Sequence, residues 1–391
     1  MLHYPYLILG GGMTAAAAMG GIRKLDSDGT IGLIGAESYP PYNRPPLSKG
    51  LWKGAPMEKV WRKIDGRGVE LHLGRSVQSL DPGEKRVVDD QGSVYTFDRL
   101  LLATGGTPRR LPFGGDDVIY YRTLADYERL RALADRGQRF AVIGGGFIGS
   151  EVAAALAMNG KQVTLVFPGG SIGERIYPGD LARFLNDIYR EKGVEVLAET
   201  LVVGLEQRDG RPVLKTRAVK DSGERDIPVD GVVAGLGIQP NVELARAAGL
   251  EVDNGIVVDE FLRTSHPDIY AAGDVASFYN PALGSRLRVE HEDNANSMGQ
   301  AAGRAMAGER AAYHHLPFFY SDLFELGYEA VGELNPQLEI VADWQEPFRQ
   351  GVIYYLQAGR ARGVLLWNVW GKVDAARQLI TETGPFRPLS V

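Results

Sequence analysis

The amino-acid sequence predicts an α/β protein with two Rossmann-like three-layer domains, followed by a C-terminal α+β domain. Two glycine-rich turns carry most of this prediction: residues 10–15 follow the apolar run 6–9, and residues 144–149 follow the apolar run 140–143. Each turn precedes a segment of helical character. Backbone N–H groups at a helix N-terminus hold phosphate in this arrangement, so the pattern predicts two dinucleotide-binding sites. From about residue 313 the sequence changes to aromatic strands, which indicates a further domain.

The first of these domains is expected to comprise residues 1–113 and 242–310. Its glycine turn opens a helix from residue 13 to about 25, in which the alanine run 15–18 allows close approach to the sheet. A proline-rich loop is expected at 40–49. Strands or hairpin strands are expected at 30–35, 69–73, 85–97 and 99–106.

The second domain is expected between a linker at 114–117 and a return linker at 240–241, so that it comprises residues 114–241. Its helices are expected at 123–135, 148–159 and 180–192, and its strands at 140–143, 163–167, near 194, near 213 and at 230–237. The C-terminal domain, residues 311–391, is expected to hold strands at 352–355 and 364–367 and a helix near 374–381.

Composition narrows the class of protein. The 391 residues carry a formal charge of −6, with 44% hydrophobic and 24% charged residues, which is typical of a soluble cytoplasmic enzyme. An acidic chain is a poor nucleic-acid binder. The first strand starts near Tyr6 and no apolar run approaches a membrane span, so we expect no signal peptide and no membrane segment. The six histidines show no metal-ligand spacing, so we expect no metal site.

Four residues define the first dinucleotide site. Gly10 makes the tight turn, Gly12 lets the backbone approach pyrophosphate, and Ala15 fills the third small position. Glu37 ends the second strand, where an acid bonds a ribose hydroxyl. The alternative is a glycine-rich loop that binds no ligand, which the strand, helix and acid together disfavour.

The second site keeps all three glycines, Gly144, Gly146 and Gly149. Its second strand, however, ends at Phe167 and no acid follows, while Arg175 is the only nearby cation that we consider as a phosphate partner. The choice between NADH and NADPH therefore stays open.

For several other polar residues, a structural role is the alternative to a role at a binding site. Asp274 lies at a strand end, where it either bonds a polyol hydroxyl or caps a following helix. Arg44 and Lys49 are either solvated loop charges or site residues. Glu151 either faces the helix dipole or pairs with a lysine, and His291 is a lone histidine of the kind that is more often structural than catalytic.

These motifs resemble those of the two-dinucleotide-binding flavoprotein reductases, a pyridine nucleotide-disulfide reductase-like superfamily with a glutathione-reductase-like fold. The branch that the chain resembles most is the apoptosis-inducing factor family, and ferredoxin and rubredoxin reductases are the neighbouring branch. The stretches that carry the resemblance are 44–49, 103–106, 144–151, 165–168, 235–241, 272–274, 288–291, 320–323, 327–330 and 364–368. The chain differs from the factor at Gly169, where the factor has glutamate, and at Tyr320, where it has tryptophan.

The resemblance implies FAD in residues 1–113 and 242–310 and NADH or NADPH in residues 114–241. It implies catalytic roles for Lys49, Glu151 and His291, with Lys49 and Glu151 paired near the flavin. On the FAD side it implies Gly10, Gly12, Thr14, Ala15, Glu37, Arg44, Lys49, Val77, Ala103, Thr104, Gly105, Asp274, Glu290, His291 and Tyr320. On the NAD(P)H side it implies Gly144, Gly146, Phe147, Ile148, Gly149, Glu151, Phe167, Gly235 and Gly237.

The chain contains no cysteine, so it holds no redox disulfide of its own. We therefore expect an FAD-dependent NAD(P)H oxidoreductase that delivers electrons to an external acceptor, which is a ferredoxin- or rubredoxin-like carrier, a quinone or oxygen. The alternative is a redox-sensing NADH-binding flavoprotein of the apoptosis-inducing-factor type, which forms a stable charge-transfer complex and recruits partners. Turnover with ferredoxin and quinone acceptors separates the two.

Overall fold

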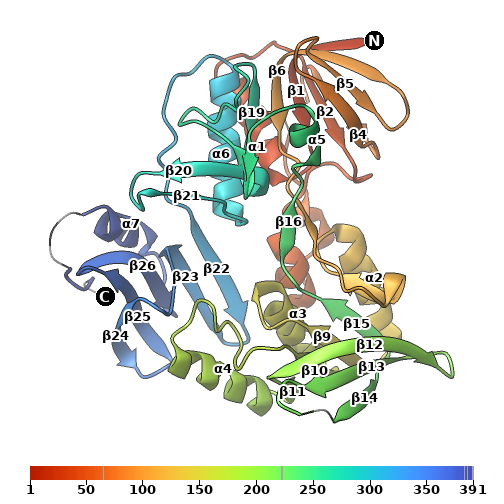
Figure 1. The fold of residues 1–391 in the computed structure, drawn as a ribbon, viewed down its shortest axis with the longest axis vertical. Coiled ribbons are helices and arrows are strands. Elements are labelled where there is room, and N and C mark those ends of the chain that lie inside the picture. The colour runs from red at the N-terminus through yellow and green to blue at the C-terminus, as the bar shows by residue number, and fades with distance from the viewer. Residues whose placement is uncertain (65, 222, 383, 385, 390–391) are drawn as a thin grey trace. The chain divides into compact units, whose positions relative to one another are not determined.

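The computed structural model describes residues 1–64, 66–221, 223–382, 384 and 386–389 (Figure 1). Its chain contacts define two compact units. Unit 1 comprises Met1–Asn43, Met57–Thr107 and Gln239–Phe319, and unit 2 comprises Arg44–Pro56, Pro108–Ile238 and Tyr320–Val391. The chain passes between them along β7 (Gly106–Pro108) and β16 (Ile238–Pro240), which pair as a two-stranded sheet.

Unit 1 is built on a seven-stranded sheet of order β3-β2-β1-β6-β5-β4, with β19 also paired to β6. The β3, β2, β1, β6 and β19 pairings are parallel, whereas β4, β5 and β6 form antiparallel pairs. The strands are β1 (Leu2–Leu9), β2 (Ile31–Gly35), β3 (Val69–Leu73), β4 (Val77–Asp81), β5 (Arg86–Asp89), β6 (Val94–Leu102) and β19 (Ile269–Ala271). The centre of this sheet is fully buried, which is why β2 and the ends of β1 and β6 read as continuous apolar runs.

Helix α1 (Met13–Arg23) lies beside a helix that we did not predict, α6 (Glu292–Met306) (Figure 1). Added side-chain carbons at Gly299 and Gly303 of α6 would overlap the backbone carbonyls of Thr14 and Ala18. These two glycines of α6 therefore let it approach the backbone of α1 closely. Asparagine and glycine give the α6 sequence a weak helix propensity, so packing against α1 decides its conformation.

A second, four-stranded sheet of order β17-β18-β20-β21 completes unit 1. Its elements, with the short helix that precedes them, are α5 (Glu243–Ala247), β17 (Val252–Asp253), β18 (Gly255–Val257), β20 (Ala276–Asn280) and β21 (Ser285–Leu287). No α-helix begins directly after Asp274, which lies in a 3₁₀ turn that leads into β20. The helix expected directly after Asp274 was wrong, because the chain enters this sheet instead. The alternative in which Asp274 caps that helix therefore does not apply, and its bond to a polyol hydroxyl stays a prediction.

Unit 2 contains a parallel five-stranded sheet of order β11-β10-β9-β15-β8. Its strands and helices are β8 (Val118–Tyr120), α2 (Leu124–Arg136), β9 (Arg139–Ile143), α3 (Phe147–Met158), β10 (Gln162–Val166), α4 (Gly179–Glu191), β11 (Val194–Leu197) and β15 (Gly231–Ala234). Thr123 caps α2 through a reciprocal pair of hydrogen bonds with Asp126, so that helix begins one residue later than expected. The glycine turn after β9 lies where the strand order reverses, which is the usual ligand position in such sheets.

Two antiparallel sheets complete unit 2. The first has the order β12-β13-β14, with β12 (Thr200–Arg208), β13 (Arg211–Ala218) and β14 (Glu224–Pro228). The second has the order β22-β23-β26-β25-β24, with β22 (Phe318–Leu323), β23 (Leu326–Gly332), β24 (Glu339–Glu346), β25 (Gln350–Gln357), β26 (Arg360–Trp367) and the following α7 (Val373–Thr381). This C-terminal sheet packs against α4 and the loop before it, where Phe184 stacks on Phe348 and Tyr177 lies against Trp367.

The predicted fold class, with two Rossmann-like sheets and a C-terminal α+β segment, is confirmed. Among the described residues, no helix is both long and apolar enough to cross a bilayer.

Candidate nucleotide-binding and redox site

The first glycine turn is shaped by two positions with opposite requirements. Gly10 has φ +118°, and a side-chain carbon there would overlap the carbonyl oxygen of Ala103 at the end of β6. Gly12 has no atom within 4 Å of the place that a side chain would take. Gly10 is thus required by packing within the protein, whereas Gly12 leaves space open at the N-terminus of α1. An open backbone position at that place fits a pyrophosphate.

Three further predicted residues of unit 1 lie close to this turn in the chain or at the next strand end: Thr14 and Ala15 in the first turn of α1, and Glu37 two residues after β2. Thr14 touches the segment that carries Asp274, because a side chain at Gly273 would overlap the Thr14 hydroxyl. Glu37 follows β2 and accepts a 2.6 Å hydrogen bond from the Tyr42 hydroxyl, which fixes its carboxylate. Ala15 is buried in the helix contact.

The segment after β6 is held by reciprocal bonds with Asn241. The Thr104 hydroxyl donates to the Asn241 carbonyl at 2.9 Å, and the Asn241 side chain donates back to the Thr104 carbonyl at 2.8 Å. Gly105 accepts from the Asn241 N–H and has φ +62°. Val77 lies apart from this segment, at the start of β4 and opposite Asp89.

The second glycine turn repeats this arrangement within unit 2. A side chain at Gly144 would overlap the Gly235 carbonyl, and one at Gly149 would overlap the carbonyl of Gly144 itself. Gly146 again has open space around it. Phe167 covers Gly145, with ring atoms 2.9 Å from where a side chain would begin. The Gly237 carbonyl, beyond Gly235, accepts from the Arg109 N–H at 2.9 Å.

The charges around the two turns fit anionic ligands. Of the α-helices in the described part of the chain, α1 and α3 alone have no acidic residue in the first turn, and neither is capped by a side chain. An acid there would repel a pyrophosphate, whereas it stabilises a helix end that binds no anion. Both turns therefore fit dinucleotides. Phe147 and Ile148 are the first two residues of α3, and their side chains are half-buried and exposed, respectively.

The structure brings Lys49 and Glu151 together in unit 2. The Lys49 Nζ lies 2.7 Å from Glu151 Oε2, and the two side chains are 14% and 3% exposed. Glu151 also accepts hydrogen bonds of 2.6 Å from the hydroxyls of Ser48 and Ser321. A buried carboxylate needs such donors to remain charged. Neither serine was predicted as a site residue, since a lone serine carries no signal until the fold places it.

Tyr320 and Arg44 also belong to unit 2. The ammonium of Lys49 lies 5.3 Å from the centre of the Tyr320 ring, within reach of a cation–π interaction. Arg44 donates to the carbonyl of Arg122 at 2.8 Å, so it is not simply a solvated loop charge.

In unit 1 the predicted pair Glu290 and His291 have separate partners. Glu290 is ion-paired with Arg288 at 2.6 Å. The His291 ring stacks on Phe319, with ring centres 4.3 Å apart and planes 12° apart. Phe319 was not expected at the site, although it directly precedes Tyr320 in the aromatic stretch that the sequence shows.

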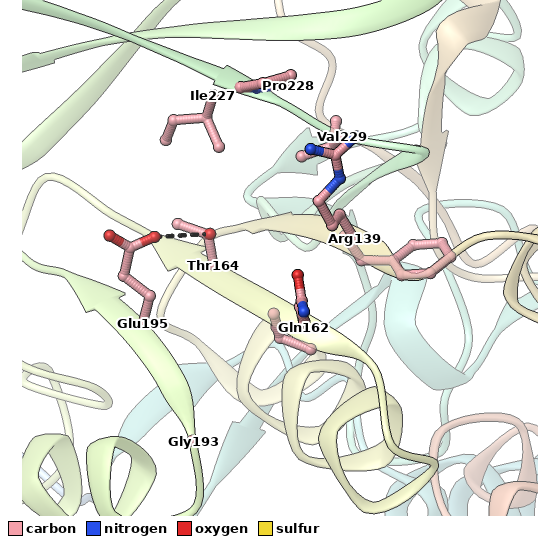
Figure 2. A pocket seen from close by; sticks show the side chains of 10 residues that line it. Arg139, Gln162, Thr164, Gly193, Glu195, Ile227, Pro228 and Val229 are labelled. Atoms are coloured by element: carbon pink, nitrogen blue, oxygen red, sulfur yellow. Dashed lines mark hydrogen bonds between the residues drawn. The ribbon is translucent and has the colours of Figure 1, made fainter.

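A separate cavity of 260 Å³ lies in unit 2, at the amino ends of the parallel strands (Figure 2). Arg139 and Gln162, the first residues of β9 and β10, line it, and Thr164 donates to Glu195 across it at 2.9 Å. Ligands of such sheets bind at the carboxyl ends of the strands, so this cavity is not the dinucleotide site.

Comparison with known proteins agrees with this geometry. Residues 4–299 match the family model of the pyridine nucleotide-disulphide oxidoreductases, and residues 342–382 match the C-terminal domain of mitochondrion-associated apoptosis-inducing factor. The chain is 36% identical over 371 residues to the ferredoxin reductase subunit of a 5,5'-dehydrodivanillate O-demethylase from Sphingobium sp., covering 92% of this chain and 89% of that one. It is 33% identical to apoptosis-inducing factor 1 of Dictyostelium discoideum, covering 97% and 78%.

Among solved structures, the chain is similar to the reductase in the covalent putidaredoxin reductase–putidaredoxin complex. The TM-score is 0.89 at 31% identity, and the match covers 97% of this chain and 94% of that one. These matches confirm the predicted resemblance. The chain belongs to the pyridine nucleotide-disulphide oxidoreductase family and is an FAD-dependent NAD(P)H oxidoreductase.

Proposed function

We propose that this protein is a ferredoxin reductase, which takes electrons from NADH or NADPH and delivers them to a small iron–sulfur protein. The observation that carries the proposal is a near full-length match to reductases whose names specify ferredoxin or putidaredoxin, in a chain that has no cysteine. A disulfide within this chain is therefore not the acceptor. An external one-electron carrier accounts for both facts.

The chain's own residues bind and position the reactants. The N-termini of α1 and α3 hold the two pyrophosphates, and Gly12 and Gly146 leave room for them. Bound FAD supplies the exchange between a two-electron donor and one-electron acceptors. Lys49 supplies a fixed positive charge, which Glu151 and its two serine donors hold in place. Such a preorganised charge favours negative charge that develops beside it.

The remaining site assignments and the three-domain division belong to the same proposal. We propose that the FAD domain is residues 1–113 and 242–310, the NAD(P)H domain is 114–241, and the C-terminal domain is 311–391. We also place the reaction in the cytoplasm, because the nicotinamide nucleotides that it consumes are intracellular. Cell fractionation with an antibody to the protein tests that location.

The test of function is turnover with a defined acceptor. Purified, FAD-loaded protein is given NADH or NADPH, a [2Fe–2S] ferredoxin and excess cytochrome c, and cytochrome c reduction is followed by absorbance. We expect a rate that depends on ferredoxin concentration and is small when ferredoxin is omitted. Equal rates with and without ferredoxin, or faster turnover with a quinone, would contradict the proposal.

A second function has one specific observation in its favour, the match of residues 342–382 to the C-terminal domain of apoptosis-inducing factor. On this alternative the protein is a redox sensor that binds NADH stably and turns over little. A long-lived charge-transfer absorbance after one equivalent of NADH, together with slow turnover on every acceptor, would favour the sensor over the reductase.

A further inference from the structure

We propose that Glu174 makes this protein select NADH over NADPH, because it supplies from a loop the acid that is missing at the end of β10. The inference rests on the proposed nicotinamide-nucleotide site at the second glycine turn. In a dinucleotide-binding βαβ unit, an acid at the end of the second strand bonds the ribose hydroxyls of NAD. Here the chain continues from Phe167 through Pro168 to Gly169, and none of the three carries a charge.

A carboxylate nevertheless lies at that strand end. A side chain at Gly169 would overlap the Glu174 carboxylate and would lie 2.7 Å from its Oε2 atom. That oxygen accepts a 2.7 Å hydrogen bond from the Gly170 N–H. The charge that Gly169 lacks is therefore present within the space that a Gly169 side chain would occupy.

The loop that carries Glu174 is fixed to the glycine turn. The Gly173 N–H donates to the carbonyl of Gly145, in the middle of the turn, at 2.9 Å. Asn186, a buried residue of α4, accepts from Ile172 N–H and donates to the Gly170 carbonyl, both at 3.0 Å. These bonds hold the carboxylate beside the carboxyl end of β10, on the path that an adenosine ribose takes from the pyrophosphate site.

The chemistry of this carboxylate suits a diol and opposes a phosphate. Two carboxylate oxygens offer about four acceptor positions, of which Gly170 uses one. Glu174 is exposed, so its remaining positions are open to the hydroxyls of a ribose. The 2'-phosphate of NADPH would place about two negative charges against it. Arg175 follows in the sequence and is also exposed, and a preference for NADPH would assign the site to Arg175 instead.

The experiment measures binding, independently of turnover and of any acceptor. Calorimetric titration of the FAD-loaded protein with NAD⁺ and NADP⁺, and with 5'-AMP and 2',5'-ADP as fragments, gives the affinity ratio directly. We expect NAD⁺ to bind at least about tenfold more tightly than NADP⁺, a difference of about 1.4 kcal/mol. Glu174→Gln should reduce that ratio about tenfold, and a similar change should appear between the two fragments.

Two further variants separate a local effect from general charge or damage. Glu224→Gln removes one negative charge at an exposed position of β14 in the same unit and should leave the ratio unchanged. Gly169→Glu combined with Glu174→Ala moves the acid to the strand end and removes the overlap, so the preference for NAD⁺ should return. Tighter binding of NADP⁺ by the parent protein, or an unchanged ratio in Glu174→Gln, would overturn the inference. Failure of ferredoxin reduction would overturn the proposed function without affecting this result.

Discussion

The buried ion pair between Lys49 and Glu151 gives a prediction that can be worked from its geometry. Replacing Lys49 by methionine keeps an unbranched side chain but removes the charge that lies 2.7 Å from a carboxylate only 3% exposed. Ser48 and Ser321 continue to donate to Glu151. The carboxylate then remains buried with two neutral donors and without its cation.

The expected loss of stability is estimated from the attraction between the two charges and from the typical cost of breaking a buried ion pair. At 2.7 Å and an effective dielectric constant of about 20, the attraction is about 6 kcal/mol. Removing one partner of a buried pair typically costs about 3–5 kcal/mol, because the other charge is left uncompensated. Lys49 is 14% exposed, so water can reach part of the vacated space. We therefore expect a loss near the lower value, about 3 kcal/mol.

Scanning calorimetry at saturating FAD measures this loss. For a unit of about 200 residues, 3 kcal/mol corresponds to a decrease in Tm of about 6–12 °C. The matched control is Lys53→Met. Lys53 pairs with Asp322 at 3.4 Å, but the pair is open to solvent, with the Lys53 side chain 46% exposed and that of Asp322 39% exposed. Exposed pairs contribute about 1 kcal/mol or less, so this control should lower Tm by only a few degrees.

The double variant Lys49→Met with Glu151→Gln tests the cause. If the uncompensated carboxylate is responsible, neutralising it should recover most of the loss, so that the double variant melts above Lys49→Met. Equal Tm values for Lys49→Met and Lys53→Met would refute this reasoning. So would a double variant that is less stable than either single variant.

Three other predictions follow from separate features. Lys49→Met should retain FAD but slow flavin reduction by NADH about tenfold or more in stopped-flow absorbance, and an unchanged rate would remove the proposed role of its charge. Gly146→Ala should fold normally and lower NAD⁺ affinity at least about tenfold, because the space beside Gly146 is open for ligand. Gly149→Ala should lower Tm as well, because the added methyl group overlaps backbone atoms. Normal NAD⁺ affinity in Gly146→Ala would contradict the pyrophosphate assignment. Burial opposes ionisation of Asp89, but hydrogen bonds led by the one from Arg75 outweigh it and lower the pKa to about 2. Because this folded pKa is below that of the unfolded chain, the carboxylate stabilises the fold above about pH 4 and that stability is lost as the pH falls toward 2. Asp89→Asn should therefore be less stable than the parent in urea at pH 7, with the difference closing toward pH 2; a constant difference would show that the ionised form is not what matters.

The glycine turns were predictable because their information is local. Strand, turn and helix are contiguous at both sites, and α1, β9 and α3 lie within one or two residues of their expected bounds. Strand β1 ends where expected but begins four residues earlier, at Leu2. Helix α6 was missed because its sequence has weak propensity and its conformation depends on contact with α1 across more than 250 positions of the chain. The serines that hold Glu151 were missed for the same reason, since Ser321 is distant in sequence from the helix it bonds.

Gly169 shows most clearly what a linear motif omits. A motif search compares the residue at the strand end and finds no acid, which leaves the nucleotide preference open. The folded loop returns a carboxylate from five positions later to the same place. What the site needs is a charge at a point in space, and the chain can supply it from any segment that the fold brings there.

The C-terminal sheet is hydrogen-bonded to the helix and the loop beside the second glycine turn. Glu151 lies on α3, the helix that this turn opens. Its donors are Ser48 at the end of a 3₁₀ turn, Lys49 directly after that turn, and Ser321 of β22. Tyr355 of the same sheet donates to the carbonyl of Ile176, in the loop that also carries Glu174. The C-terminal segment therefore supports both the carboxylate that holds Lys49 and the loop that we assign to nucleotide selection. A change in this sheet acts on the proposed site through those bonds, even where the changed residue touches no ligand.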